Sequence, residues 1–332
     1  MFKTALITLF STLFLPSCLF TQDVKTKELS LHNDEVVFYN VENLFDNEID
    51  STRGYKEFNP NGKKKWDKYK FNSKINEIAK CLAAASNEGP EFIGLAEIEN
   101  ELVLQKIISH PLLFKHHYEI LHFESKDVRG IDVALLYKSS VMDLISYKKI
   151  VIKKKRRPTR DILVVLGIHK QTKDTLAFLV NHWPSRYGGK KKSEKSRVLA
   201  ATTLQFHMDS IKNKYTSCKI IAMGDFNDGP RDSSMSKVLD NIHYTNLFKD
   251  SVPTYGSLKY RLKWQVFDQF VVSNNLLEKK GVYVNYVEIF SPEWLLEEDK
   301  KYGGSKPFRT YLGPIYHGGV SDHLPVILKL KH

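Results

Sequence analysis

Apolar runs of five to eight residues alternate with polar segments along the chain, and this pattern indicates buried strands. The runs are rich in Val, Ile, Leu and Phe and span residues 36–41, 92–96, 131–137, 162–168, 176–181, 219–223, 266–273 and 325–330. Apolar residues recur at helical spacing in two further segments, 73–86 and 193–212. Neither an internal repeat nor a Pro- or Gly-rich linker divides the sequence, so we expect one α/β domain over residues 30–332.

A polar side chain able to do chemistry stands at the end of most of these runs. These residues are Asn40, Glu97, His182, Asp225 with Asn227, Asp268 within FDQFVV, and the pair Asp322 and His323. Turns favour Asp, Asn and Gly but do not require Glu or His. A carboxylate inside an apolar strand needs a partner that offsets its desolvation. We therefore expect these side chains to meet at one site.

Several of these residues also have a purely structural interpretation. On its own, the stretch MGDFND (residues 223–228) is as compatible with a strand followed by a tight turn as with a site. Asn40 could cap a turn, Asn43 is expected in a loop, and His182 could be a packed histidine. Only the combination of motifs favours a site.

Two acidic positions are assigned by their place relative to the apolar runs. Glu97 is preferred over Glu99 and Glu101 because it alone directly follows FIGLA. Asp132, in RGIDVALLY, is expected to begin a strand rather than to line the site.

The first residues resemble a secretory signal. A short basic start, an apolar run from Ala5 to Leu15 and an early change to polar sequence are typical of a signal peptide, here residues 1–22, and the run is too short to span a bilayer. The stretch LPSC also resembles a lipobox in which Cys18 is lipidated. Anchored and free forms both stay open, and we expect an exported protein.

The other two cysteines, Cys81 and Cys218, belong to no short-spaced metal or redox motif. We expect two thiols in or near the core rather than a disulfide, because an exported protein of this size does not depend on one.

Lys and Arg outnumber Asp and Glu by 50 to 38, and the excess is clustered. Residues 148–160 carry eight basic side chains and no acidic one, and a second basic stretch runs from Arg186 to Arg197. Such runs favour polyanions such as nucleic acid or an anionic membrane surface. Taken alone, a charge run is more often a solvated surface.

Seven motifs in chain order resemble the endonuclease/exonuclease/phosphatase superfamily, the fold of exonuclease III and deoxyribonuclease I. They are FYNVENLF, LAEIEN, GIDVALLY, NHWPSR, MGDFND, FDQFVVS and VSDHLPV. The resemblance covers nearly the whole chain after the signal and implies a four-layer sandwich of two packed mixed β-sheets flanked by helices. HWPSR, TRDIL and RTYLGPIYHGGVSDHLPV look most like exported bacterial members usually labelled endonucleases.

The resemblance also implies a role for each polar residue. Asn40 and Glu97 would hold a divalent cation, with Mg²⁺ expected and Mn²⁺ or Ca²⁺ as alternatives. Asp322 would lie beside the cation as a ligand or as a neighbouring group. Asp225 and Asn227 would orient the attacking water and a phosphate oxygen.

The histidines and basic residues complete the implied site. His323 would hydrogen-bond the scissile phosphate or act as a base, with Asp268 fixing its tautomer. His182 would stabilise the transition state or protonate the leaving oxygen. Basic residues after the His182 motif would grip the substrate's phosphate backbone; these are Arg186, Lys190 and Arg197.

The leading hypothesis is an exported, metal-dependent phosphodiesterase that cuts nucleic acid, with DNA as the expected substrate and endonucleolytic cleavage. The abasic-site nucleases of this superfamily usually carry Tyr where this chain has His182, which places the resemblance closer to the deoxyribonuclease, sphingomyelinase and phosphatase branches. This departure argues against DNA repair, as does export. A secreted, periplasmic or outer-membrane-anchored bacterial protein is expected. No obligate protein partner is evident, and membrane association is expected only if Cys18 is lipidated.

Two other functions compete with this one. The enzymatic alternative hydrolyses a lipid-linked or inositol-type phosphoester, for which Ile289, Phe290 and Trp294–Leu296 are candidate membrane contacts, although core packing is the stronger interpretation of them. A catalytically inactive polyanion-binding protein ranks last, because the key acids and His323 are all present.

Overall fold

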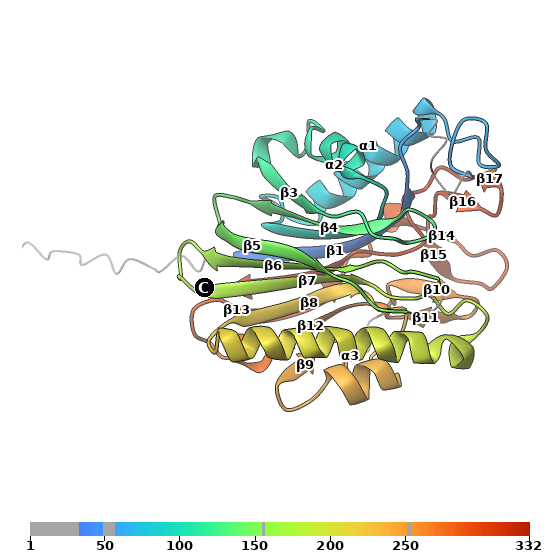
Figure 1. The fold of residues 1–332 in the computed structure, drawn as a ribbon. Helices are drawn as coiled ribbons and strands as arrows, with labels where there is room; N and C mark the ends of the chain where they lie inside the picture. Colours follow the sequence, from blue (N-terminus) through green and yellow to red (C-terminus); the bar gives the residue numbers. More distant parts are fainter. Residues whose placement is uncertain (1–32, 49–56, 155–156, 251–253) are drawn as a thin grey trace, which may run out of the picture. The chain divides into compact units, whose positions relative to one another are not determined.

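The apolar runs of the sequence become the central strands of two six-stranded sheets (Figure 1). The structure is a computed structural model and describes residues 33–48, 57–154, 157–250 and 254–332. The expected signal peptide and Cys18 lie outside the described residues.

The first sheet has the strand order β13-β18-β1-β2-β4-β3. Its strands are β1 (Asn33–Leu44), β2 (Phe92–Ile98), β3 (Tyr118–His122), β4 (Asp132–Lys138), β13 (Tyr283–Ile289) and β18 (Val326–Lys331). β1 and β2 are parallel, and β18 and β4 flank them in antiparallel orientation. The ends of β1 and β2 therefore lie at the same edge of the sheet as the start of β18.

The second sheet has the strand order β5-β6-β7-β8-β12-β9. Its strands are β5 (Met142–Ile150), β6 (Ile162–His169), β7 (Thr175–His182), β8 (Lys219–Asp225), β9 (Tyr244–Asn246) and β12 (Asp268–Ser273). β7 and β8 are parallel, while β12 runs antiparallel to β8. The ends of β7 and β8 thus meet the start of β12.

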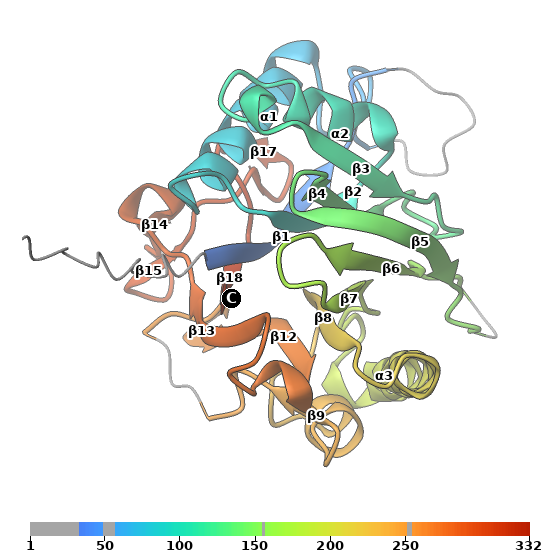
Figure 2. The ribbon, with the colours of Figure 1, turned by 90° about the vertical axis from the view of Figure 1, so that its left-hand side faces the viewer.

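Helices cover the outer face of each sheet (Figure 2). α1 (Lys68–Ala84) and α2 (Glu101–Ile108) pack on the first sheet, and α3 (Lys190–Lys214) packs on the second together with the π-helical turn η2 (Ser234–Leu239). Between the sheets lies a separate core that includes Phe38, Phe92, Phe178 and Phe270. The order helices, sheet, sheet, helices confirms the four-layer sandwich expected from the sequence.

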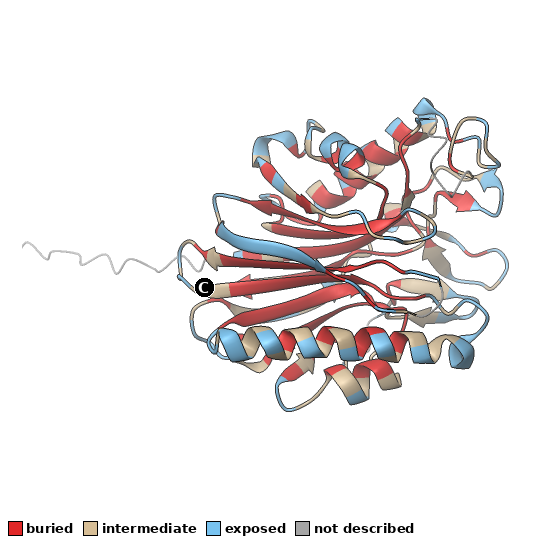
Figure 3. Ribbon diagram, in the orientation of Figure 1, coloured by how far each residue is buried: buried red, intermediate tan, exposed pale blue. Residues whose placement is uncertain are grey.

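Residues are most deeply buried in the central strands of the two sheets (Figure 3). Every residue of β2, β4, β8 and β12 is buried, because these strands are covered on both faces. The edge strand β5 is exposed over most of its length. The continuous apolar runs in the sequence are thus the central strands of the two sheets.

Shorter elements join the layers and were not expected from the sequence. They are the hairpin strands β10 (Leu258–Tyr260), β11 (Lys263–Gln265), β14 (Leu296–Glu298), β15 (Ser305–Pro307), β16 (Tyr311–Leu312) and β17 (Ile315–Tyr316), and the 3-10 turns η1 (Phe114–His116), η3 (Asn274–Leu276) and η4 (Glu293–Leu295). At two or three residues each, the hairpin strands are too short to produce a periodic signal.

Other expectations can be compared with the described residues. Cys81 and Cys218 are buried free thiols, as expected. Leu295 is buried, and Ile289, Phe290 and Trp294 pack against the core, so core packing and not membrane contact accounts for this segment. Among the described helices, none combines the length and the apolar sequence needed to cross a membrane.

Candidate active site

Neighbouring strands of the second sheet place three polar side chains in one row. In the pair β7–β8, His182 lies opposite Asp225, and in the pair β8–β12, Asp225 lies opposite Asp268. All three residues are buried. The strand register alone therefore assembles a large part of the expected site.

A glycine allows this row to form. Gly224 lies opposite Asn181 on β7, and a Cβ atom at position 224 would lie 2.3 Å from the carbonyl oxygen of Asn181. Because non-bonded atoms do not approach so closely, only glycine lets β8 lie this near to β7 just before Asp225.

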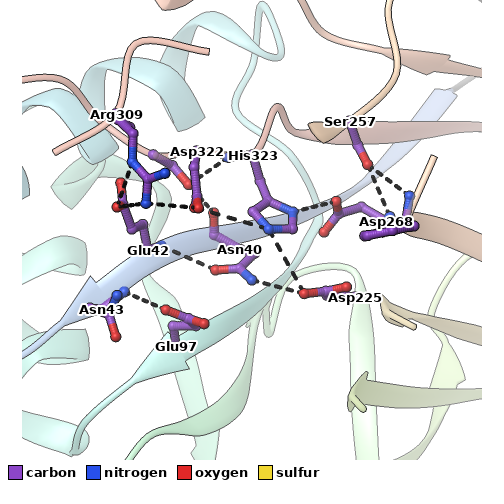
Figure 4. Close-up of polar contacts among 12 residues, drawn as sticks. Asn40, Glu42, Asn43, Glu97, Asp225, Ser257, Asp268, Arg309, Asp322 and His323 are labelled. Atoms are coloured by element: carbon purple, nitrogen blue, oxygen red, sulfur yellow. Dashed lines mark hydrogen bonds and ion pairs between the residues drawn. The ribbon is translucent and has the colours of Figure 1, made fainter. Parts of the chain in front are cut away.

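Asp268 and His323 form a buried hydrogen-bonded pair (Figure 4). Nδ1 of His323 lies 2.6 Å from Oδ2 of Asp268, and Nε2 faces Oδ2 of Asp225 at 3.9 Å. Burial alone would lower the pKa of His323, but Asp268 and Asp225 outweigh it and raise this pKa well above its usual value. A protonated His323 favours a hydrogen bond to phosphate over the role of base.

Amide groups from both sheets hold Asp225. Its Oδ2 accepts hydrogen bonds from Nδ2 of Asn40 at 3.1 Å and from Nδ2 of Asn227 at 3.2 Å, and its Oδ1 accepts from the backbone N–H of Asn227 at 2.9 Å. Burial raises the pKa of Asp225 to about 7, with His323 opposing the shift and Asp268 adding to it. A carboxylate with a fixed orientation and this pKa is suited to take a proton from water near neutral pH.

His182 lies between Asp225 and Glu97. Its Nε2 is 3.5 Å from Oδ2 of Asp225 and 3.8 Å from Oε1 of Glu97. Burial lowers the pKa of His182 well below its usual value, and the cations Arg160 and Arg129 add to the shift. The imidazole is therefore neutral at neutral pH and acts as a hydrogen-bond donor or acceptor rather than as an acid.

The backbone around Glu97 and the end of β1 is unusual. Glu42, Asn43 and Asn227 each have φ 52°, and Glu97 has φ 65°, a left-handed conformation that residues other than glycine rarely adopt. The ladders from β2 to β1 and to β4 both shift register here, and such bulges redirect side chains at sheet edges. Asn43, expected in a loop, is thus the irregular end of β1. Backbone strain of this kind concentrates at functional sites.

Oxygen atoms suited to a divalent cation gather at the ends of β1 and β2. Oε2 of Glu97 accepts the backbone N–H of Asn43 at 2.7 Å, and Oε1 lies 3.3 Å from Nη2 of Arg129. The side-chain oxygen of Asn40 accepts the backbone N–H of Glu42 at 3.1 Å. Carboxylate and amide oxygens fit Mg²⁺, so Glu97 and Asn40 would hold it. The bound ion would polarise a phosphoryl oxygen.

Asp322 lies beside this set but already has a cationic partner. Nη2 of Arg309 is 3.0 Å from Oδ2 of Asp322 and 2.7 Å from Oε1 of Glu42 (Figure 4). The buried ammonium of Lys74 hydrogen-bonds the backbone oxygen of Glu42 and, at 2.6 Å, Oγ1 of Thr310. Because Arg309 already pairs with both carboxylates, we expect Asp322 to lie beside the metal rather than to ligate it.

Arg197 does not fit its expected role in substrate binding. Its side chain is fully buried, and its Nε lies 2.7 Å from Oδ2 of Asp228. The expectation for Arg197 is wrong because helical periodicity turns this position of α3 toward the core, where the guanidinium forms a structural ion pair. Lys190 remains half exposed and is ion-paired with Asp232.

Arg186 contacts the backbone of the site. Its Nε donates to the carbonyl oxygen of Asn227 at 2.9 Å, and its Nη2 lies 3.1 Å from Oδ1 of Asp228 and 2.6 Å from Oδ2 of Asp232. Its guanidinium lies 4.5 Å from the ring centre of Phe267. Because these contacts use most of its donors, we expect Arg186 to position Asn227 rather than to bind substrate.

We expect Arg186→Lys to lower kcat by roughly 10- to 100-fold with little change in KM. The single ammonium of lysine cannot hydrogen-bond the carbonyl of Asn227 and both carboxylates at once, so Asn227 would shift. Steady-state kinetics at several salt concentrations check this, with the exposed Arg231 changed to Lys as the matched control. A raised KM with unchanged kcat and a flatter salt dependence would instead indicate direct contact with phosphate.

Three charged residues of the site were not anticipated from the sequence. Glu42 and Arg309 lie within quoted motifs, FYNVENLF and RTYLGPIYHGGVSDHLPV, and their opposite charges were the available signal. Arg129 precedes GIDVALLY and reaches Glu97 from a loop. Asp132 begins β4, as expected, and accepts a hydrogen bond from the backbone of Ser125 at 2.9 Å.

A model of the endonuclease/exonuclease/phosphatase family matches residues 35–332. The chain belongs to this family. It is therefore a phosphoesterase of the endonuclease/exonuclease/phosphatase family, whose enzymes depend on divalent metals. A comparison with curated proteins by sequence gives no match.

Solved structures of the family's fold resemble the chain over most of its length. D. rerio TDP2 carrying 14 humanizing mutations is 13% identical and has a TM-score of 0.59, covering 90% of this chain and 99% of that chain. The human nocturnin catalytic domain with bound sulfate is 15% identical, with a TM-score of 0.58 and coverage of 90% and 94%. A mannosyl-6-phosphatase from Bacteroides thetaiotaomicron is 16% identical, with a TM-score of 0.58 and coverage of 90% and 99%. At these identities the likeness shows the fold alone.

Proposed function

We propose that the protein is an exported, metal-dependent phosphodiesterase that cuts DNA internally. One observation carries this proposal. Two exposed tyrosines, Tyr187 and Tyr260, each have lysines or arginines nearby in the sequence, and each lies on a segment connected to one of the two proposed catalytic histidines. Aromatic and basic side chains on either side of a phosphoesterase site are suited to an extended nucleic acid, because they stack bases and attract the backbone.

The first segment follows His182. Tyr187 is 83% exposed, and the exposed residues Lys190, Lys191 and Lys192 open α3 directly after it. The same segment contains Arg186, which holds Asn227. A direct hydrogen bond from Arg186 thus connects this exposed segment to Asn227 of the proposed site.

The second segment is the β10–β11 hairpin. Leu258 forms an isolated bridge with His323, and two residues later Tyr260 is 63% exposed. The guanidinium of Arg261 lies 5.3 Å from the Tyr260 ring centre, and Lys263 is exposed on the other strand. The hairpin thus starts next to His323 and exposes an aromatic ring and two cationic side chains a few residues further along.

In the proposed reaction, Asp225 and Asn227 orient the attacking water, and Asp225 accepts its proton. His323 donates through Nε2 to a phosphate oxygen while Asp268 holds its Nδ1 side. As the bond from phosphorus to the leaving oxygen breaks, His182 stabilises the negative charge that develops on that oxygen. The contacts of Asp225, Asn227 and His323 described above support these roles.

Two further observations bear on the substrate. One structure with this fold is D. rerio TDP2 complexed with a single-strand DNA product, at 14% identity, which supports DNA. The mannosyl-6-phosphatase neighbour favours a second candidate, a phosphomonoesterase acting on a small phosphate ester. The lipid-linked substrate loses support, because the apolar residues considered for membrane contact pack into the core.

Incubation of the purified protein with supercoiled plasmid tests the proposal. We expect nicked and then linear DNA in Mg²⁺ and intact plasmid in EDTA. Intact plasmid in Mg²⁺ together with hydrolysis of mannose 6-phosphate would overturn the nuclease and favour the phosphomonoesterase. Export is tested separately by fractionating cells that express the full chain with and without residues 1–22.

Changing Lys190, Lys191 and Lys192 together to Ala is expected to weaken DNA binding and to make it less dependent on salt. The slope of log binding constant against log salt concentration should fall by up to about 0.9 for each phosphate that the variant no longer neutralises. Binding measured between low and physiological salt checks this. Lys212→Ala with Lys214→Ala is the matched control, because these lysines lie roughly 30–36 Å away at the other end of α3. Equal slopes in all three proteins would leave the first group as a solvated surface.

A further inference from the structure

A second cluster of metal-ligand types lies toward the other end of β1. Asp34, His169 and His332 each offer one ligand atom, and these atoms all lie within 4.8 Å of one another. Their side chains are nearly inaccessible to solvent, with 6%, 2% and 3% exposed. Asp34 precedes Asn40 by six residues on the same strand, about 20 Å at the usual rise. The cluster is therefore separate from the active site.

Asp34 faces both imidazoles. Its Oδ2 lies 3.0 Å from Nε2 of His169, and its Oδ1 is hydrogen-bonded to Nε2 of His332 at 3.3 Å. Although Oδ2 of Asp34 lies this close to His169, it accepts no hydrogen bond. A hydrogen bond from the ring of His169 therefore does not explain why these two atoms lie so near each other. A buried carboxylate needs a compensating charge, and a cation between these atoms would supply it.

The other side of His169 faces a hydroxyl that can accept its second ring N–H. Its Nδ1 lies 2.9 Å from Oγ1 of Thr172, and this hydroxyl donates to Oδ2 of Asp174 at 3.0 Å. Metal-binding imidazoles generally donate their second N–H to such a partner, which leaves the first nitrogen free for the ion. The backbone N–H of Thr172 donates to Nδ1 at 3.1 Å. Binding of an ion at Nε2 therefore requires the ring proton to sit on Nδ1, where it would be donated to Oγ1 of Thr172 in place of this contact.

We propose that Asp34, His169 and His332 bind one Zn²⁺ that fastens the two sheets together. Two imidazoles and one carboxylate are ligands that Zn²⁺ takes, whereas Mg²⁺ prefers oxygen ligands. Asp34 lies on β1 and His332 directly follows β18 in the first sheet, while His169 ends β6 in the second. The ion would thus be structural, and the two metal sites of the chain would select different ions.

Zinc content and thermal stability test this proposal. The full chain, purified without a histidine tag, is equilibrated with Zn²⁺, freed of excess and measured by elemental analysis and by melting with and without a zinc chelator. We expect one Zn²⁺ per chain and a lower melting temperature after chelation. Wild-type protein that retains no zinc, or that melts identically with and without it, would overturn the proposal.

Variants locate the ion. His169→Ala and the isosteric Asp34→Asn are each expected to weaken zinc binding by more than the roughly 10- to 100-fold that an outer partner contributes, and both should keep Mg²⁺-dependent hydrolysis. The exposed His243→Ala is the matched control. His323→Ala is informative because Asp225, Asp268 and His323 also offer ligand atoms within 4.8 Å of one another. Zinc lost in His323→Ala but kept in His169→Ala and Asp34→Asn would place the ion in the active site and refute the inter-sheet site.

Discussion

Replacing His323 with alanine is expected to lower the rate of phosphoester hydrolysis by about 100- to 10,000-fold, the range that removal of one positioned donor or acid–base group covers. The imidazole is the group whose Nε2 faces Asp225 while Nδ1 is held 2.6 Å from Asp268. Alanine removes the donor and leaves the carboxylates of Asp225 and Asp268 without their cation. The measurement is kcat/KM on the substrate that the wild type cleaves, in saturating Mg²⁺.

Folding of this variant needs a separate check, because His323 is buried. His323→Gln keeps a polar side chain of similar size and should show the same loss with an unchanged melting temperature. Adding Asp268→Asn to His323→Ala should cost little more, since two residues that act as a unit are not additive. Near wild-type turnover in a folded His323 variant would remove the mechanism proposed above.

The arrangement of His182, Asp225 and Asp268 was largely readable in the sequence. His182 and Asp225 follow continuous apolar runs and Asp268 lies within one, and such runs predict strands covered on both faces. The row that they form needs the pairing of β7 with β8 and of β8 with β12. Single-sequence patterns carry no information on pairing, so the resemblance to a family supplied that step.

The direction of charged side chains was not readable in the same way. Arg186 and Arg197 belong to one basic stretch, yet the first holds the backbone of Asn227 and the second is buried against Asp228. Charge counts cannot separate these cases, because burial of an arginine depends on which acid the fold brings to it. The same holds for Arg309, whose partner Glu42 is 267 residues away.

The two histidines of the candidate site, His182 and His323, illustrate why environment and not residue type determines protonation. Arg160 and Arg129 lie near His182 and reinforce the lowering of its pKa by burial, whereas Asp268 and Asp225 raise the pKa of His323 against its burial. Opposite shifts in one site separate a neutral imidazole from a protonated one at the same pH. Both histidines look alike in the sequence, so this division of roles emerges only from the packed structure.

Glu97→Gln is expected to produce the second large effect, a loss of Mg²⁺ affinity of at least about tenfold and a fall in hydrolysis of about 1,000-fold. Glu97 is the carboxylate at the register shift of β2, where its backbone has φ 65°, and its negative charge is what a hard cation requires. Glutamine keeps an oxygen that can accept the N–H of Asn43, now made to Oε2 at 2.7 Å. The fold should therefore survive the change while the metal site does not.

Calorimetric titration with Mg²⁺ measures the affinity without relying on turnover. Glu101→Gln is the matched control, because Glu101 is an exposed acid in the first turn of α2 and lies only four residues further along the chain. The two variants lose the same formal charge, so a general electrostatic effect would weaken Mg²⁺ binding in both. Weakening confined to Glu97→Gln would identify a ligand, whereas wild-type affinity in that variant would move the ion away from Glu97 and toward the carboxylates now paired with Arg309.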